Sequence, residues 1–270
     1  MKHAMRSLLN TAAACALLVC ARAASAQDIG MTIFNSANTA AINIAGIDAM
    51  NSTISAQYGS NSAPSRPQEP YRWGAGKKYA THPAPSPIAE IDTSPPVALD
   101  YRPDVAVTRS VNARFAEALG QAMPDKRDQI AAEMDSGTLQ TQFSNLLASY
   151  GYSSRNVADV MTAYLVIAWE VVHNEDATRS PNGIGSVHRS MQKSLAHSAS
   201  MRRLTDAQKQ ELAETLGNLT MLAAIAKNTL VQRGDSAGLA TLQDGVRTTT
   251  QKFGIDLKSV QLTDEGFTEQ

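Results

Sequence analysis

The sequence predicts an all-α fold: a multi-helix domain, orthogonal or bundle-like, preceded by a disordered Pro-rich tether. Between Thr108 and Phe253 there is almost no strand-like run and only two prolines, and apolar residues recur at helical spacing. Nine of the 11 prolines lie instead between Pro64 and Pro103. Proline fixes its own φ and lacks a hydrogen-bond donor, so that stretch favours an extended spacer over helix or sheet.

The composition fits one globular domain with some additional chain. The 270 residues carry 24 basic and 25 acidic side chains and are 43% hydrophobic. These values exclude collagen-like, coiled-coil and wholly disordered proteins, and a nucleic-acid binder that works by bulk charge. The chain divides into three predicted parts: a signal peptide over 1–26, an Asn/Ser- and then Pro-rich tether over 27–103, and a helical domain over 104–267.

The first 26 residues have the pattern of a secretory signal peptide. A short basic start precedes an apolar run that ends at Val19, and Ala24-Ser25-Ala26 is an A-x-A cleavage signal. We expect cleavage before Gln27 and export to the periplasm or the extracellular space. The alternatives are a lipoprotein, which Val19 before Cys20 disfavours, and an uncleaved membrane anchor. Cleavage would leave a cysteine-free chain with a net charge of −4, and no membrane insertion is expected after it.

Two features of the tether have alternative interpretations. The alternating segment 41–47 is either an edge or partner-binding strand, or part of a disordered stretch with scattered isoleucines. Tyr71, Trp73 and Tyr79 lie among basic residues and would either stack on a glycan or a base, or pack loosely on the domain.

The first helices of the domain are predicted from apolar stripes. One stripe follows Thr108 and contains Val111, Phe115, Ala118, Leu119 and Ala122. Asp125 is the expected N-cap of a short helix with Ile130 and Met134. A third stripe runs from Leu139 to Tyr150, and Gly151 occupies the position where a left-handed residue ends a helix.

The central helix is expected to begin at Ser153 or Ser154 and to end near His173. Nine apolar residues between Val157 and Val172 cover an arc of roughly 160° at 100° per residue. So wide an arc predicts several packing partners. The opposite, polar face is expected to hold Arg155, Asp159, Glu170 and His173.

The later helices carry recognisable start and stop signals. Residues 186–200 suggest a thin amphipathic helix with Val187, Met191 and Leu195 inward. Thr205 and Gln208 form a capping box that opens a long helix ending at Gly234. Ser236 is the expected cap of the last helix, with Gly254 as its stop.

Two parts of the chain resemble a family of secreted bacterial proteins, domain-of-unknown-function family 6683. They are 163–169 (Ala-Tyr-Leu-Val-Ile-Ala-Trp) and the closing segment with 254–257 and 262–267. The resemblance implies export and a helical domain behind a variable N-terminal region. It implies no activity and no catalytic residues, and we expect it to span roughly residues 104 to 267 without the tether.

The best metal candidate is Glu170-x-x-His173, which puts a carboxylate and an imidazole on one helical face. Glu175, Asp176 and His188 are nearby in the sequence. Di-iron bundles use this motif twice, with two further glutamates, and here it occurs once. The alternative is structural, because an imidazole at a helix C-terminus interacts favourably with the helix dipole.

Two other features have a functional and a structural interpretation. Trp169 is either a ligand or partner anchor or part of the core, which we favour. The loop 174–185, with Pro181, Gly183 and Gly185, is either a binding loop or a plain surface loop.

The sequence therefore predicts no catalytic, cofactor-binding or metal-binding residue and no cofactor. P-loop, nucleophile-elbow and dinucleotide-binding patterns do not occur. We expect an exported, non-enzymatic binding module of the cell envelope, whose partner is a protein or another envelope component and not a nucleic acid. The alternative is a metal-dependent enzyme that uses Glu170 and His173.

Overall fold

The computed structural model describes Ile54 and residues 95–269, and the domain is mostly helical, as the sequence predicts. The predicted signal peptide, the segment 41–47, the cluster with Trp73 and the tether up to residue 94, apart from Ile54, lie outside the described residues. Ile54 is fully buried in the hydrophobic core.

Eight α-helices, three short 3₁₀ turns and one β-hairpin make up residues 105–269. The helices are α5 (Val105–Ala122), α6 (Arg127–Asp135), α7 (Thr138–Ala148), α8 (Val157–His173), α9 (Pro181–Ala196), α10 (Ala199–Arg202), α11 (Asp206–Arg233) and α12 (Ser236–Lys252). The 3₁₀ turns are η1 (Pro124–Lys126), η2 (Ala177–Arg179) and η3 (Leu257–Ser259). The antiparallel strands are β1 (Val260–Thr263) and β2 (Gly266–Glu269), paired with Thr263 opposite Gly266.

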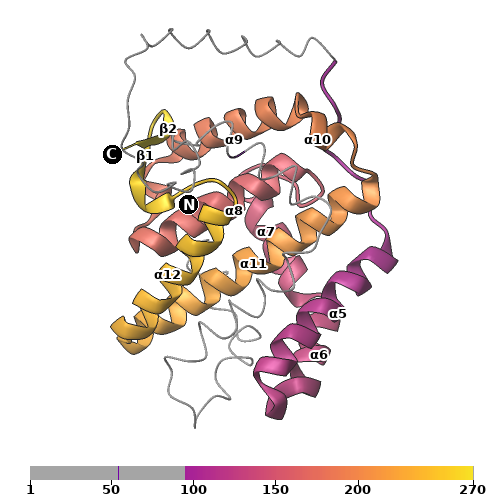
Figure 1. Ribbon diagram of the computed structural model, residues 1–270, viewed down its shortest axis with the longest axis vertical. Helices are drawn as coiled ribbons and strands as arrows, with labels where there is room; N and C mark the ends of the chain where they lie inside the picture. Colours follow the sequence, from indigo (N-terminus) through magenta and orange to yellow (C-terminus); the bar gives the residue numbers. More distant parts are fainter. Residues whose placement is uncertain (1–53, 55–94, 270) are drawn as a thin grey trace, which may run out of the picture.

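Helix α8 is the centre of the domain, as its wide apolar arc predicts. It packs against α11, α9 and α12 and touches α7, η2 and η3. Figure 1 shows α11 running diagonally through the molecule, with α5 and α6 at one end and α9 and the hairpin on the other side. The middle of α11, residues 215–224, is buried on every side, so α8 and α11 together form the interior.

Several helix termini are where the sequence places them. Thr205 and Gln208 make the predicted capping box at the start of α11. Gly151, Gly234 and Gly254 have φ values of 76°, 67° and 90°, which is the left-handed region that glycine enters without steric cost.

Three predicted N-caps are wrong. Asn156, not Ser153 or Ser154, caps α8, and its side chain accepts hydrogen bonds from the N–H groups of residues 158 and 159. Asp235, not Ser236, caps α12. Asp125 lies inside η1, and α6 starts after it with no side-chain cap. In the first two cases the actual cap, an Asn or an Asp, lies one to three residues from the predicted serine. Asn, Asp and Ser cap helices about equally well, so tertiary contacts decide which of them becomes the N-cap.

The predicted loop 174–185 is shorter than expected because α9 already begins at Pro181. The first position of a helix suits proline, since its N–H would lack a partner there in any case. Gly183 and Gly185 therefore lie within the helix. The connection between α8 and α9 contains η2 and begins with Asn174, which ends α8 with a φ of 52°. The inward residues Val187, Met191 and Leu195 are buried, as predicted.

The packed part of the chain begins before the predicted boundary at residue 104. The segment 95–103 is extended, and Leu99 and Tyr101 are buried against the domain. Leu99 accepts a backbone hydrogen bond from Val157, and the Tyr101 N–H donates to the carbonyl of Arg155. Proline prevents helix formation here but does not prevent an extended strip from packing.

The C-terminal hairpin was not predicted, because each strand has only four residues. It lies against α9, and α8 reaches it through one hydrogen bond. The Trp169 indole N–H donates to the Val260 carbonyl oxygen at 3.1 Å, and Ser186 Oγ donates to the Asp264 carbonyl oxygen at 2.8 Å. None of the helices in the described part of the chain has the length and apolar character needed to cross a membrane.

Candidate binding pocket

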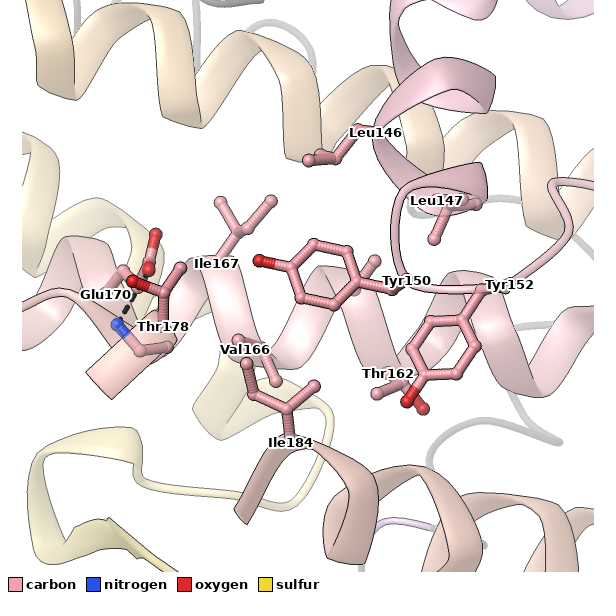
Figure 2. Close-up of a pocket in the computed structure, with 12 residues that line it drawn as sticks. Leu146, Leu147, Tyr150, Tyr152, Thr162, Val166, Ile167, Glu170, Thr178 and Ile184 are labelled. Atoms are coloured by element: carbon pink, nitrogen blue, oxygen red, sulfur yellow. Dashed lines mark hydrogen bonds between the residues drawn. The ribbon is translucent and has the colours of Figure 1, made fainter. Parts of the chain in front are cut away.

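A pocket opens beside α8, between the end of α7, η2 and the start of α9 (Figure 2). Its cavity volume is about 40 Å³, the empty space that extends from it into open solvent is about 430 Å³, and its lining is almost entirely apolar. The lining residues are Leu146, Leu147, Tyr150, Tyr152, Thr162, Ala163, Val166, Ile167, Glu170, Ala177, Thr178 and Ile184.

The floor of the pocket is one stripe of α8. Ala163, Val166, Ile167 and Glu170 are spaced by three and four residues, so they share a face of the helix. Of these four residues only Ile167 belongs to the predicted apolar arc, and it lies at the edge of that arc. Ala163, Val166 and Glu170 lie on the opposite face of α8, so the pocket is on the side of the helix that was expected to be polar.

The wall opposite α8 is built by the turn that ends α7. Gly151 is left-handed, and the Tyr152 N–H donates back to the carbonyl of Leu147 at 3.0 Å. This is the Schellman arrangement, which fixes the direction of the residues on both sides of the glycine. Tyr150 and Tyr152 are therefore both directed to the pocket, with ring centroids 6.2 Å apart.

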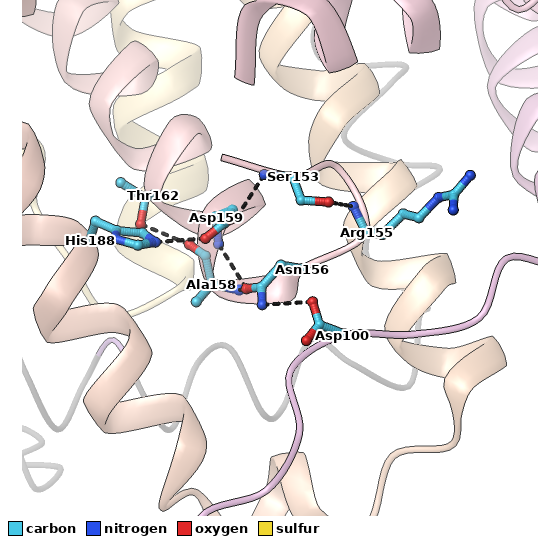
Figure 3. Close-up of polar contacts among 8 residues, drawn as sticks. All are labelled: Asp100, Ser153, Arg155, Asn156, Ala158, Asp159, Thr162 and His188. Carbon is cyan, nitrogen blue, oxygen red and sulfur yellow. Dashed lines mark hydrogen bonds and ion pairs between the residues drawn. The ribbon is translucent and has the colours of Figure 1, made fainter. Parts of the chain in front are cut away.

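Contacts of His188 with Asp159 and with the Tyr152 ring support that ring; Figure 3 shows the contact between His188 and Asp159. His188 on α9 stacks on the Tyr152 ring, with centroids 4.2 Å apart, and its Nε2 lies 2.6 Å from Asp159 Oδ1. The other Asp159 oxygen accepts the Ser153 N–H at 2.7 Å. The carboxylate thus connects α8, α9 and the α7–α8 loop. The sequence placed Asp159 on the polar face, which is wrong, because the residue is buried.

Glu170 lies at the opposite end of the pocket from Tyr152. Its Oε1 accepts the Ala177 N–H at 2.8 Å. Burial raises the pKa of the Glu170 carboxyl, while the Lys227 ammonium and the Ala177 hydrogen bond act against this rise. Burial in turn lowers the pKa of Lys227, which donates to the Glu175 carbonyl oxygen at 3.0 Å. Burial, with the nearby Glu170 charge, raises the pKa of Tyr150.

Four of the five residues considered for a metal site have separate structural partners, and that of Glu170 is the Ala177 N–H. His173 Nε2 lies 2.8 Å from the Leu257 carbonyl oxygen, and the ring stacks on Trp169. Asp176 caps η2 through the Thr178 N–H. His188 pairs with Asp159, at the other end of the pocket from Glu170. Among the described residues no three His, Asp or Glu side chains are placed to hold a metal ion.

The sequence pattern did not reveal the residues that shape the pocket. Tyr150 was assigned only to a core stripe, and Tyr152, Ile184 and Ala177 were not selected. Gly151 was the available signal, because a left-handed glycine between two tyrosines directs both rings. Trp169 is buried in the core, as we favoured.

A family model of unknown function, DUF6683, matches residues 5–270. No curated protein and no solved structure matched the chain. The match includes the N-terminal region, which the resemblance was expected to leave out. That expectation was wrong because the resemblance was based on segments of the helical domain alone. Since the family model covers nearly the whole chain, the protein belongs to this family of unknown function, DUF6683.

Proposed function

We propose that this protein is an exported, non-enzymatic binding module of the cell envelope, and that its ligand inserts an apolar group into the pocket beside α8. The main support for this proposal is the apolar character of the pocket lining. The lining is almost entirely apolar and includes two tyrosine rings, which is typical of binding sites for apolar groups.

The polar side chains around the pocket support a binding role. Asp159 holds His188 and the Ser153 N–H, and Glu170 holds the Ala177 N–H. Each of these groups has a structural partner within the domain, as expected for side chains that fix a pocket's shape. Export is supported by the signal-peptide pattern of the first 26 residues.

The test is a titration with straight-chain alkanols of increasing length, followed by NMR. Affinity should rise about three- to fourfold per methylene group, the value for burying one CH₂. The rise should stop when the chain fills the stripe from Thr162 to Glu170, about 12 Å at 1.5 Å per residue.

Two variants make this test specific to the pocket. Ala163→Met fills the pocket from its floor and should abolish most of the binding. Ala132→Met, at an exposed position of α6, is the matched control and should bind as the wild type does. Affinity that does not depend on chain length, or equal binding by Ala163→Met, would contradict the proposal.

A further inference from the structure

The two ends of the pocket differ in chemistry. At one end the Tyr152 ring stacks on His188, and at the other lies the Glu170 carboxyl group. Figure 2 shows the Tyr150 ring between them, with its hydroxyl group directed toward the Glu170 end. The apolar stripe of Ala163, Val166 and Ile167 connects both ends. A ligand that lies along this stripe therefore brings one of its ends to Glu170.

Glu170 retains capacity to bind such a ligand. One of its oxygens accepts the Ala177 N–H, but a carboxylate offers about four acceptor positions. The residue lines the pocket itself. A hydrogen-bond donor that arrives along the stripe would meet an acceptor in a largely apolar site, where such a bond is strong.

Glu170 is the charged group that a ligand in the pocket meets. The Asp176 carboxylate, in the connection before η2, acts on Glu170 as a like charge. The Lys227 ammonium of α11 is an opposing charge, held by the Glu175 carbonyl oxygen, and the Arg179 guanidinium acts on Asp176. The Tyr150 hydroxyl also faces Glu170. Asp176, Lys227 and Arg179 do not line the pocket, whereas Glu170 does, so its carboxylate favours a cationic donor.

We propose that the pocket takes a single-chain amphiphile with an amine head group, its alkyl chain along the α8 stripe and its ammonium at Glu170. This inference rests on the proposed function and adds the head group. An anionic head would face the Glu170 carboxylate, and a neutral head would gain only an ordinary hydrogen bond.

The test compares three ligands with the same eight-carbon chain at pH 8: octylammonium, octan-1-ol and octanoate. Octylammonium should bind roughly tenfold more tightly than octan-1-ol, the gain for a charge-assisted hydrogen bond over a neutral one. Octanoate should bind more weakly than octan-1-ol. An octylammonium affinity equal to or below that of octan-1-ol would overturn the inference.

Two substitutions should change the ratio of the octylammonium affinity to the octan-1-ol affinity in opposite directions. Glu170→Gln keeps an acceptor for Ala177 but removes the charge, so the preference for octylammonium should disappear while octan-1-ol binding stays. Lys227→Met removes the opposing charge and should increase the preference. Asp125→Asn, at an exposed position of η1, is the control and should keep the wild-type ratio. A Glu170→Gln variant that still prefers octylammonium would overturn the inference.

The ratio should also depend on pH. Burial raises the pKa of the Glu170 carboxyl, so lowering the pH through this raised pKa should remove the octylammonium preference and leave octan-1-ol binding unchanged. Glu170→Gln should show no such change. If octan-1-ol binds and the head group has no effect, the head-group inference fails alone; if neither ligand binds, the proposed function fails with it.

Discussion

Asp159 is the residue on which the shape of the pocket depends most. Its two oxygens hold His188 of α9 and the Ser153 N–H of the α7–α8 loop. The Asp159 and His188 side chains are only 10% and 14% exposed, so solvent screens the pair weakly. A pair of this kind is costly to break, because the remaining partner is left buried without compensation.

Replacing Asp159 by alanine should therefore lower the free energy of unfolding by about 2–4 kcal/mol. Urea denaturation measures the change. Asp125→Ala, at an exposed position, should change it by less than about 0.5 kcal/mol. Similar stabilities for the Asp159→Ala variant and the wild type would show that the carboxylate does not connect the three elements.

The sequence did not reveal this residue, for a physical reason. Helical periodicity places Asp159 on the polar face of α8, and its partner His188 is 29 residues away on another helix. The spacing of apolar residues shows which face of a helix is apolar. It does not show that a second helix brings an imidazole onto the polar face and buries a carboxylate there.

At the scale of elements, the C-terminal hairpin is attached to the domain by its close packing against α9. The backbone of α9 approaches β1 so closely at Gly183 that a Cβ atom there would lie 2.1 Å from the Thr263 carbonyl oxygen. At Gly185 of the same helix, a Cβ would meet only the flexible end of the Arg189 side chain, at 3.4 Å.

These two glycines should respond to alanine in opposite ways. Gly183→Ala should destabilise the protein by about 2–3 kcal/mol, because the hairpin must move away from α9. Gly185→Ala should stabilise it by up to about 1 kcal/mol, through helix propensity. Thermal unfolding of both variants measures the effect. Two changes of the same sign would contradict the close contact between α9 and β1.

Helices were largely predictable from the sequence, and the hairpin was not. The stripes with Val187 in α9 and with Leu139 in α7 are buried as predicted, because the core selects apolar residues at helical spacing. The strands are too short for a period of two to emerge. Their position is set instead by tertiary bonds, such as that from Trp169 to Val260.

At the scale of the whole molecule, the domain includes the extended segment that precedes α5. Leu99 and Tyr101 belong to the hydrophobic core. The predicted boundary at residue 104 followed from the proline content of the segment before it. A proline-rich segment can still bury alternate side chains when a folded surface lies beside it.

Leu99→Ala should therefore destabilise the domain by about 2–4 kcal/mol, the usual cost of truncating a buried leucine. Val105→Ala is the matched control, because Val105 is 64% exposed, and it should be nearly neutral. Urea denaturation of the full-length chain compares the two. If Leu99→Ala were as neutral as the control, the segment would not belong to the core.

The most direct test of the account maps ligand binding onto the methyl groups of the full-length chain. In an NMR titration with octan-1-ol, the methyl signals of Leu146, Val166, Ile167 and Ile184 should shift together and saturate. Those of Leu242 and Val246, buried in α12, should stay in place. Shifts spread over the whole domain, or saturable shifts only outside the pocket, would contradict the central claim that this pocket binds an apolar ligand.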